Sequence, residues 1–284
     1  MPEYELRTPA NLKETLDILA KEPGIWKLFA GGTDLMVIFE TGKLTYKKFL
    51  NVNSLTELKG FVVNEEDILI GAGCTYSQIQ NHALIKKEFP LLVQSGKVTG
   101  AIAIQNRGTI GGNIANMSPA ADTPPVLLAY DADLILLSNT GYRVVSYRYF
   151  HQEYKKSDLR TNEIIMAIRL RRQQGNTHSY YRKVGARSAQ AISKVCMAET
   201  ACVFRGQKVE WLKIGLGSVG PIPMRALKTE AYLSEKELSP TTIAEAGKVL
   251  LSEITPIDDI RSEAVYRNQV AVNLLAEFLE GLKR

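Results

Sequence analysis

The sequence is poor in the residues that bind metals or form disulfides. Its 284 residues include three cysteines and three histidines: Cys74, Cys196, Cys202, His82, His151 and His178. An odd number of widely spaced cysteines does not form a disulfide framework. An iron–sulfur cluster needs several thiolates, often closely spaced, and the His-Glu-x-x-His pattern of many zinc enzymes is missing. We therefore expect no metal site. The alternative left open is a metal site whose ligands are far apart in the sequence.

Long apolar runs and a strong charge of one sign are also missing. No stretch approaches the roughly 18 apolar residues that span a bilayer. Glu3 and Glu5 stand where a secretory signal would carry positive charge. The 35 basic and 30 acidic residues leave a net charge of +5, and the basic residues are scattered, which argues against nucleic acid as a partner. We expect a soluble, cytoplasmic protein without membrane insertion.

The apolar patterns predict an α+β fold. A helix is expected to be capped by Thr8, to begin at Pro9 and to end near Gly24. Further helices are expected at 35–39, 75–82, 91–103 and 124–129, from Ser239-Pro240 onward, and at about 260–279. Strands are expected at 25–30, 49–52, 60–63, 68–71, 134–138, 143–146, about 164–168, about 179–184, about 194–204 and 209–216. The polar segment 173–177 divides the predicted chain into domains 1–175 and 176–284.

Two glycine turns carry the best binding signal. They are Ala30-Gly31-Gly32-Thr33-Asp34 and Gly108-Thr109-Ile110-Gly111-Gly112-Asn113. Glycine permits positive φ and a close approach of a ligand to the main chain, and successive free N–H groups form a nest that binds anions. One such turn alone is weak evidence. Two in the same half of a chain favour the diphosphate of a dinucleotide.

A third glycine pattern suggests a competing function. Residues 215–220 read Gly-Leu-Gly-Ser-Val-Gly and fit the dinucleotide pattern of nicotinamide-binding folds. Pro221 and Pro223 follow at once, where that fold needs a helix, and no strand with a terminal acidic residue follows. We interpret this segment as the end of a strand and a turn.

The motifs jointly resemble one family. Residues 104–116 read Ile-Gln-Asn-Arg-Gly-Thr-Ile-Gly-Gly-Asn-Ile-Ala-Asn, and 118–125 read Ser-Pro-Ala-Ala-Asp-Thr-Pro-Pro. Together with 28–35, 181–185, 216–226, 258–261 and 266–267, they are similar to the FAD-binding medium subunit of molybdenum hydroxylases of the xanthine dehydrogenase and carbon monoxide dehydrogenase type. The resemblance covers almost the whole chain. Gln105 departs from it, since the family usually has arginine there.

This resemblance implies a fold and a set of cofactor contacts. The fold would be a p-cresol methylhydroxylase-type FAD-binding domain, with a small α/β subdomain and a larger mixed or antiparallel sheet subdomain, followed by a C-terminal antiparallel sheet with helices. Asp122 would contact the cofactor, as a hydrogen-bond acceptor suited to a ribose or adenine donor, Ile165 would contact its adenine end and Lys183 its flavin ring. The implied contacts are Lys27, Leu28, Phe29, Ala30, Gly31, Gly32, Thr33, Asp34, Thr109, Ile110, Gly111, Gly112, Asn113, Asp122, Ile165 and Lys183.

The implied function is electron transfer within a complex. A large partner would hold molybdopterin, a small partner would hold 2Fe-2S clusters, and non-covalent FAD in this chain would pass electrons to an acceptor. The chain itself has no predicted catalytic residue. Substrate and acceptor (NAD, oxygen or a quinone) stay open. The alternatives are a stand-alone flavin-dependent oxidoreductase of related fold and a non-catalytic interaction subunit.

Overall fold

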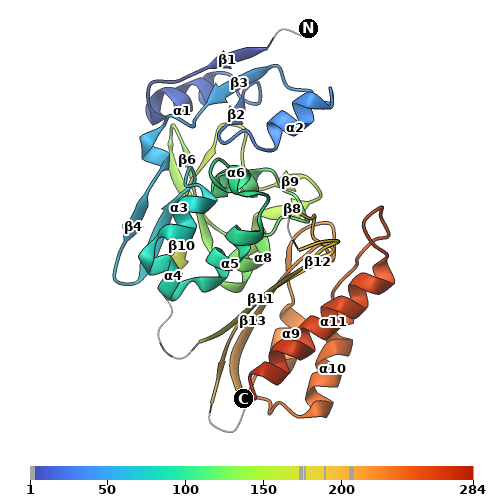
Figure 1. The fold of residues 1–284 in the computed structure, drawn as a ribbon. Helices are drawn as coiled ribbons and strands as arrows, with labels where there is room; N and C mark the ends of the chain where they lie inside the picture. Colours follow the sequence, from blue (N-terminus) through green and yellow to red (C-terminus); the bar gives the residue numbers. More distant parts are fainter. Residues whose placement is uncertain (1–3, 173–174, 176, 189, 205–207, 284) are drawn as a thin grey trace.

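The computed structural model describes residues 4–172, 175, 177–188, 190–204 and 208–283. Most of the predicted boundary segment 173–177 lies outside these residues. Figure 1 shows three regions stacked along the long axis of the molecule, with the N-terminal region at the top and the C-terminal region at the bottom. The strands and helices described below belong to this part of the chain.

The N-terminal region is a small parallel sheet with two helices. Its strands run in the order β1 (Glu5–Arg7), β3 (Lys48–Asn51) and β2 (Lys27–Phe29). Helix α1 (Leu12–Lys21) buries Leu16 and Leu19 in a core with Trp26 and Leu50. Helix α2 (Leu35–Glu40) follows the first glycine turn and buries no residue.

The predicted start of the first helix is wrong by three residues. Asn11, not Thr8, caps α1, because its side-chain oxygen accepts a hydrogen bond from the Glu14 N–H at 2.9 Å. The Thr8 hydroxyl instead accepts a hydrogen bond from the Asn51 amide at 3.3 Å. Both residues are good cap formers, and the contact with Asn51 on β3 engages Thr8 elsewhere.

The middle region is an antiparallel sheet flanked by short helices. The strand order is β4 (Phe61–Val63), β5 (Asp67–Gly71), β10 (Ile164–Arg171), β6 (Asp133–Ser138) and β7 (Gly141–Ser146). The other elements are η1 (Thr56–Leu58), α3 (Tyr76–Asn81), α4 (Ala83–Glu88), α5 (Pro90–Val98), α6 (Ile102–Gln105), α7 (Ile110–Ala115), α8 (Pro124–Ala129), η2 (Tyr147–Tyr149), β8 (His151–Glu153) and β9 (Lys156–Ser157). The predicted single helix 91–103 is two helices, since Gly100 adopts φ of 59° between them.

The C-terminal region is a second antiparallel sheet, in the order β11 (His178–Val184), β12 (Val195–Val203), β13 (Val209–Gly217) and β14 (Met224–Arg225). Helices α9 (Leu227–Leu233), α10 (Pro240–Leu251) and α11 (Ala264–Gly281) cover one face (Figure 1). The last helix begins four residues later than predicted, where Asp258 accepts the N–H of Ala264.

Strand β12 is buried on both faces. Val195, Met197 and Ala201 join the core beneath α10 and α11. On the opposite face, Ala198 belongs to the core of the middle region, and the Thr200 hydroxyl donates to the Ala129 carbonyl of α8 at 3.0 Å. The C-terminal sheet therefore lies between its own helices and the middle region.

Residues 215–220 confirm the interpretation as a strand end and turn. Gly215 and Gly217 are the last part of β13, and a Cβ on Gly215 would overlap the carbonyl oxygen of Pro125 in α8. The glycines therefore allow β13 to pack against α8. This glycine pattern serves the close packing of a strand on a helix.

Candidate functional site

The first glycine turn presents a row of free main-chain donors. The N–H groups of Gly31, Gly32, Thr33 and Asp34 have no acceptor among the described residues. Gly32 adopts φ of 73°, which turns the chain from β2 into α2, whose first bond runs from the Met36 N–H to the Gly32 carbonyl at 2.9 Å. Successive N–H groups in such a turn form an anion-binding nest. The turn can therefore receive a phosphate group.

The second glycine turn was also expected to have free N–H groups, and it does not match that expectation. Its glycine-flanking N–H groups are engaged within the protein: Ile110 donates to the Cys74 carbonyl at 3.0 Å, and Gly111 to the Ala72 carbonyl at 2.9 Å. Thr109 caps α7 by accepting the Gly112 N–H at 3.1 Å. Because these donors are occupied, the expectation of an open nest is wrong here. The second turn instead forms one side of the site, held in place by these internal hydrogen bonds.

The adjacent glycines of this turn have different surroundings. A Cβ on Gly111 would lie 2.6 Å from the Ala72 Cβ, whereas one on Gly112 would meet only the Thr109 hydroxyl, at 2.8 Å. Gly111 is buried and Gly112 is exposed. The side-chain oxygen of Asn113 is buried and has no hydrogen-bond partner among the described residues. An exposed glycine beside an unpartnered acceptor suits contact with a ligand hydroxyl or N–H.

The two turns lie side by side although they are far apart in the sequence. A Cβ on Gly31 would overlap the carbonyl oxygen of Arg107, so only glycine allows this approach. The Arg107 guanidinium donates to the Gly31 carbonyl at 3.4 Å, and the Asn116 amide donates to Asp34 at 3.1 Å. Lys27 lies 4.9 Å from the centre of the Tyr46 ring. The Arg107 cation therefore borders the free donors, where positive charge favours an anionic ligand.

Asp122 and Lys183 form a buried ion pair. Their charged atoms are 2.7 Å apart, and their side chains are 9% and 10% exposed. Lys183 also donates to the Val98 carbonyl at 3.0 Å, and the Ser193 hydroxyl donates to the other Asp122 oxygen at 2.7 Å. Burial raises the pKa of Asp122, and the Lys183 ammonium opposes that rise.

The ion pair limits which parts of the cofactor Asp122 and Lys183 can contact. Asp122 was expected to contact a ribose or adenine donor, and Lys183 the flavin ring, which are distant parts of an extended dinucleotide. The Lys183 ammonium and an Asp122 carboxylate oxygen are only 2.7 Å apart. A ligand that touched both side chains would therefore meet them with one and the same part. Ser193 was not expected at all, and nothing in its sequence context marks it.

Two further residues of interest lie inside the protein. Ile165 is 5% exposed and pairs with Leu136 next to a bulge in β10, where the ladder of main-chain bonds is interrupted. Gln105 is buried, donates to the Lys97 carbonyl at 3.0 Å and accepts from Gln80 at 3.1 Å. Gln105 thus joins neighbouring helices, an internal contact that needs no cation.

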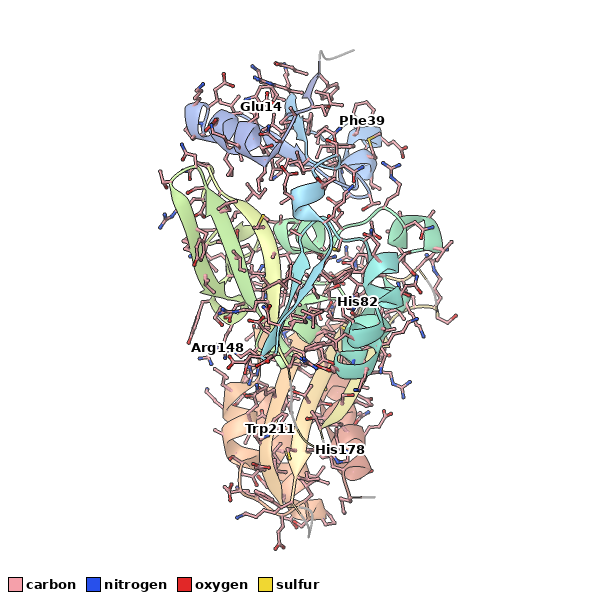
Figure 2. All side chains as sticks on the ribbon, turned by 90° about the vertical axis from the view of Figure 1, so that its left-hand side faces the viewer. Glu14, Phe39, His82, Arg148, His178 and Trp211 are labelled. Carbon is pink, nitrogen blue, oxygen red and sulfur yellow. The ribbon has the colours of Figure 1, made fainter. Side chains whose placement is uncertain are left out.

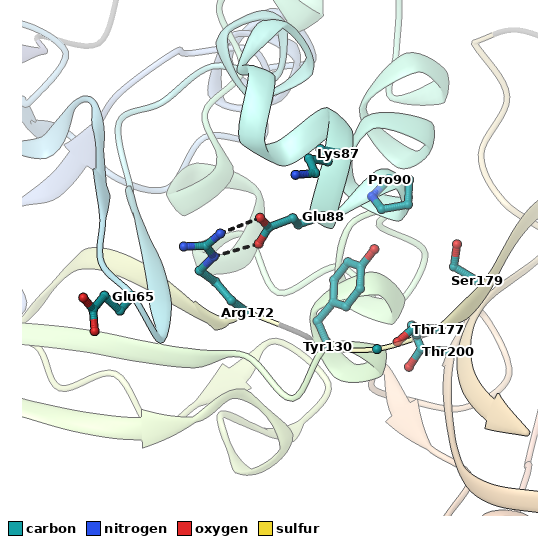
Figure 3. A pocket seen from close by; sticks show the side chains of 10 residues that line it. Glu65, Lys87, Glu88, Pro90, Tyr130, Arg172, Thr177, Ser179 and Thr200 are labelled. Carbon is teal, nitrogen blue, oxygen red and sulfur yellow. Dashed lines mark hydrogen bonds and ion pairs between the residues drawn. The ribbon is translucent and has the colours of Figure 1, made fainter. Parts of the chain in front are cut away.

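A separate cavity of about 480 Å³ lies between α4, α5 and the C-terminal sheet (Figure 3). Its wall includes Tyr130, Thr200 and the ion pair of Arg172 with Glu88, in which the two bonds measure 2.7 and 2.8 Å. None of the predicted cofactor contacts lines it. The cavity is therefore distinct from the site at the glycine turns.

Groups that could bind a metal ion and helices that could span a membrane are both missing from the described residues. Within the described residues, no group of three or more His, Cys, Asp and Glu side chains could hold a metal ion. His82 lies in the middle region and His178 in the C-terminal region (Figure 2). No helix of the described chain is long and apolar enough to cross a membrane.

Two known protein families match this chain and decide the family to which it belongs. A family described as the FAD binding domain in molybdopterin dehydrogenase matches residues 2–171, and the CO dehydrogenase flavoprotein C-terminal domain matches residues 179–282. The chain belongs to this family of FAD-binding subunits. The sequence resemblance and the α+β fold are thereby confirmed.

Relatives of this FAD-binding subunit are medium chains of several dehydrogenases. The glyceraldehyde dehydrogenase medium chain of Sulfolobus acidocaldarius is 29% identical over 269 residues, which cover 95% of this chain and 94% of that one. The xanthine dehydrogenase FAD-binding subunit of Escherichia coli O157:H7 is 28% identical, covering 91% and 88%. A chain of carbon monoxide dehydrogenase from Hydrogenophaga pseudoflava superimposes with a TM-score of 0.93 at 25% identity, covering 97% and 96%.

Proposed function

We propose that this FAD-binding medium subunit transfers electrons inside a multi-subunit molybdenum hydroxylase, with FAD held non-covalently at the two glycine turns. The observation that carries this proposal is the row of free N–H groups at Gly31–Asp34, packed against the second turn. A diphosphate carries negative charge and several acceptor oxygens. Such a group matches main-chain donors bordered by the Arg107 guanidinium.

The cofactor contacts follow from the surroundings of each segment. Residues 31–34 would bind the diphosphate, while Lys27, Leu28, Phe29 and Ala30 would form the wall that leads to it. Thr109, Ile110, Gly111, Gly112 and Asn113 would form the facing wall, with Gly112 and the Asn113 oxygen toward the cofactor. Ile165 would offer main-chain atoms at the bulge of β10.

Asp122 and Lys183 would act as one unit. Because they are paired, we propose that both face a single part of the cofactor, with Lys183 placing positive charge there. When bound, FAD supplies the chemistry, since it exchanges one or two electrons and so connects one-electron carriers with two-electron acceptors. This chain positions the cofactor and sets the charge around it.

The proposed partners are a large molybdopterin-binding subunit and a small 2Fe-2S subunit. Support comes from the names of the relatives, which are medium chains or FAD-binding subunits of dehydrogenases. We also propose a cytoplasmic location, consistent with cysteines that form no disulfide. The division of the chain into 1–175 and 176–284 is kept as a proposal.

The first experiment is a visible absorption spectrum of the purified chain, repeated on the supernatant after denaturation. We expect a flavin band that is released as FAD. If no band develops even after FAD is added, the proposed function is overturned. Oxidase or dehydrogenase activity of the chain without partners would favour a stand-alone flavoenzyme instead.

A matched pair of variants locates the site. Gly32 and Gly42 both adopt positive φ, at 73° and 68°, so alanine strains the backbone at both positions; at Gly32 the added Cβ would also lie 2.7 Å from the Phe29 ring, which has to shift. Only Gly32 lies in the proposed site, whereas Gly42 has no neighbouring atom within 4 Å of an added Cβ. We expect Gly32→Ala to lose bound FAD and Gly42→Ala to retain it.

A further inference from the structure

The hairpin of β8 and β9 has a lysine in an unusual main-chain conformation. Lys155 lies between His151–Glu153 and Lys156–Ser157 and adopts φ of 58°. Glycine adopts this left-handed region freely, whereas side chains other than those of Asn and Asp seldom do. Such strained residues are concentrated at binding sites, where the side chain itself is needed.

The ammonium group of Lys155 is fixed against the end of α7. It donates to the Asn116 carbonyl at 2.6 Å and to the Asn116 side-chain oxygen at 3.1 Å. An ammonium has three donors, and the third has no acceptor among the described residues. No carboxylate of the described chain lies within ion-pair distance of it.

Asn116 connects this ammonium to the first glycine turn. Its side-chain amide donates to Asp34 at 3.1 Å, so a single side chain separates Lys155 from the residue that ends the row of free N–H groups. Figure 1 shows the hairpin of β8 and β9 below α2, the helix that follows the first glycine turn.

Lys155 is a partly buried cation with no ion-pair partner among the described residues. Partial burial lowers the pKa of its ammonium, and Lys27 lowers it further, while Asp34 acts in the opposite direction. Arg107 adds a third cation next to Gly31. Three cationic side chains therefore approach this turn together with the carboxylate of Asp34, an excess that a diphosphate would neutralise.

We propose that Lys155 is a further cofactor-binding residue, whose ammonium stabilises the diphosphate of FAD at the two glycine turns. This inference rests on the proposed function. It explains why a side chain occupies a position that suits glycine: the charge is needed there, and Asn116 joins it to Asp34, the last residue in the row of free donors.

The test compares two variants of the full chain after removal of flavin. Lys155→Gln removes the charge and keeps the strained backbone, whereas Lys155→Gly removes both. We expect both to bind added FAD at least about ten-fold more weakly than wild type at low salt, with a smaller dependence of Kd on salt. Lys155→Gly should melt at a higher temperature than Lys155→Gln. Loss of affinity without loss of stability distinguishes binding from a structural role.

Two controls complete the test. Lys156→Gln removes a charge from the same hairpin, where Lys156 is exposed and pairs with Glu153 at 2.9 Å, and it should bind FAD as wild type does. Lys155→Arg should retain most of the affinity. If Lys155→Gln and Lys155→Gly bind FAD as tightly as wild type, the inference alone is overturned. A wild-type chain that binds no FAD would overturn the proposed function and this inference together.

Discussion

The ammonium of Lys183 lies 2.7 Å from a carboxylate oxygen of Asp122, with both side chains almost removed from water. Lys183 belongs to β11 of the C-terminal sheet, and Asp122 precedes α8 of the middle region. The pair therefore joins the two regions, and removing one partner leaves an uncompensated charge.

Loss of Lys183 should destabilise the fold strongly. Lys183→Met leaves the Asp122 carboxylate with Ser193 as its remaining side-chain partner, and we expect the free energy of unfolding to fall by about 3–5 kcal/mol at neutral pH. The double variant Asp122→Asn with Lys183→Met should recover most of this loss. Urea unfolding of the three variants measures both effects. A double variant no more stable than Lys183→Met would contradict the pair's role.

The adjacent glycines of the second turn should respond differently to alanine. Gly111→Ala forces a Cβ against Ala72 and should cost about 1–3 kcal/mol of stability. Gly112→Ala should stay within about 1 kcal/mol of wild type, because its Cβ meets only the Thr109 hydroxyl and alanine favours helix. The same Cβ should weaken FAD binding about ten-fold or more. Fluorescence titration with FAD measures the change in affinity, and urea unfolding measures the change in stability.

Removal of a buried acid should stabilise the protein. Glu199 on β12 is fully buried, and neither carboxylate oxygen has a hydrogen-bond partner among the described residues. Burial raises its pKa well above the ordinary value, and Glu277 raises it further. The pKa of Glu199 is therefore higher in the folded protein than in the unfolded chain. The protein keeps its full stability below the unfolded-state pKa of this carboxyl, and it loses stability as the pH rises from there toward the folded-state pKa.

Glu199→Met should therefore raise the free energy of unfolding by about 1–3 kcal/mol at pH 8, and by less near pH 4, where both states bind the proton. Urea unfolding at the two pH values provides the comparison. An equal gain at both would show that packing, not protonation, is responsible.

His151 should contribute to acid sensitivity. Burial lowers its pKa to about 4, and its ring accepts or donates a hydrogen bond with the Tyr147 hydroxyl at 2.9 Å. Since the folded-state pKa lies below the unfolded value, its contribution is complete above about pH 6.5 and is lost as pH falls toward 4. The loss should approach about 3 kcal/mol. His151→Gln should flatten this part of the pH profile of urea unfolding, and an unchanged profile would exclude His151 as the cause.

The local parts of the structure could be predicted from the sequence, since local chemistry determines them. Thr75 caps α3 and forms a reciprocal pair of hydrogen bonds with Gln78, and the polar segment before Ile68 joins β4 and β5 as an antiparallel hairpin. The first glycine turn lies between a strand and a helix, as expected. In each case the residues involved are a few positions apart.

Features that depend on distant residues could not be predicted. Nothing near Ser193 indicates that its hydroxyl reaches Asp122, and the burial of Gln105 follows from the packing of α3 and α5 around it. The second turn also has adjacent glycines and a threonine, but Cys74 and Ala72 accept the N–H groups of its Ile110 and Gly111. Composition therefore identified both turns, and only tertiary packing shows which one keeps its donors free.

The burial of β12 on both faces has a consequence for how the chain folds. One face needs α10 and α11, and the other needs α8 of the middle region. Neither half can complete its interior alone, so the middle region should stay incompletely packed during synthesis until the C-terminal sheet has formed. Once folded, the two regions should unfold together in one cooperative transition.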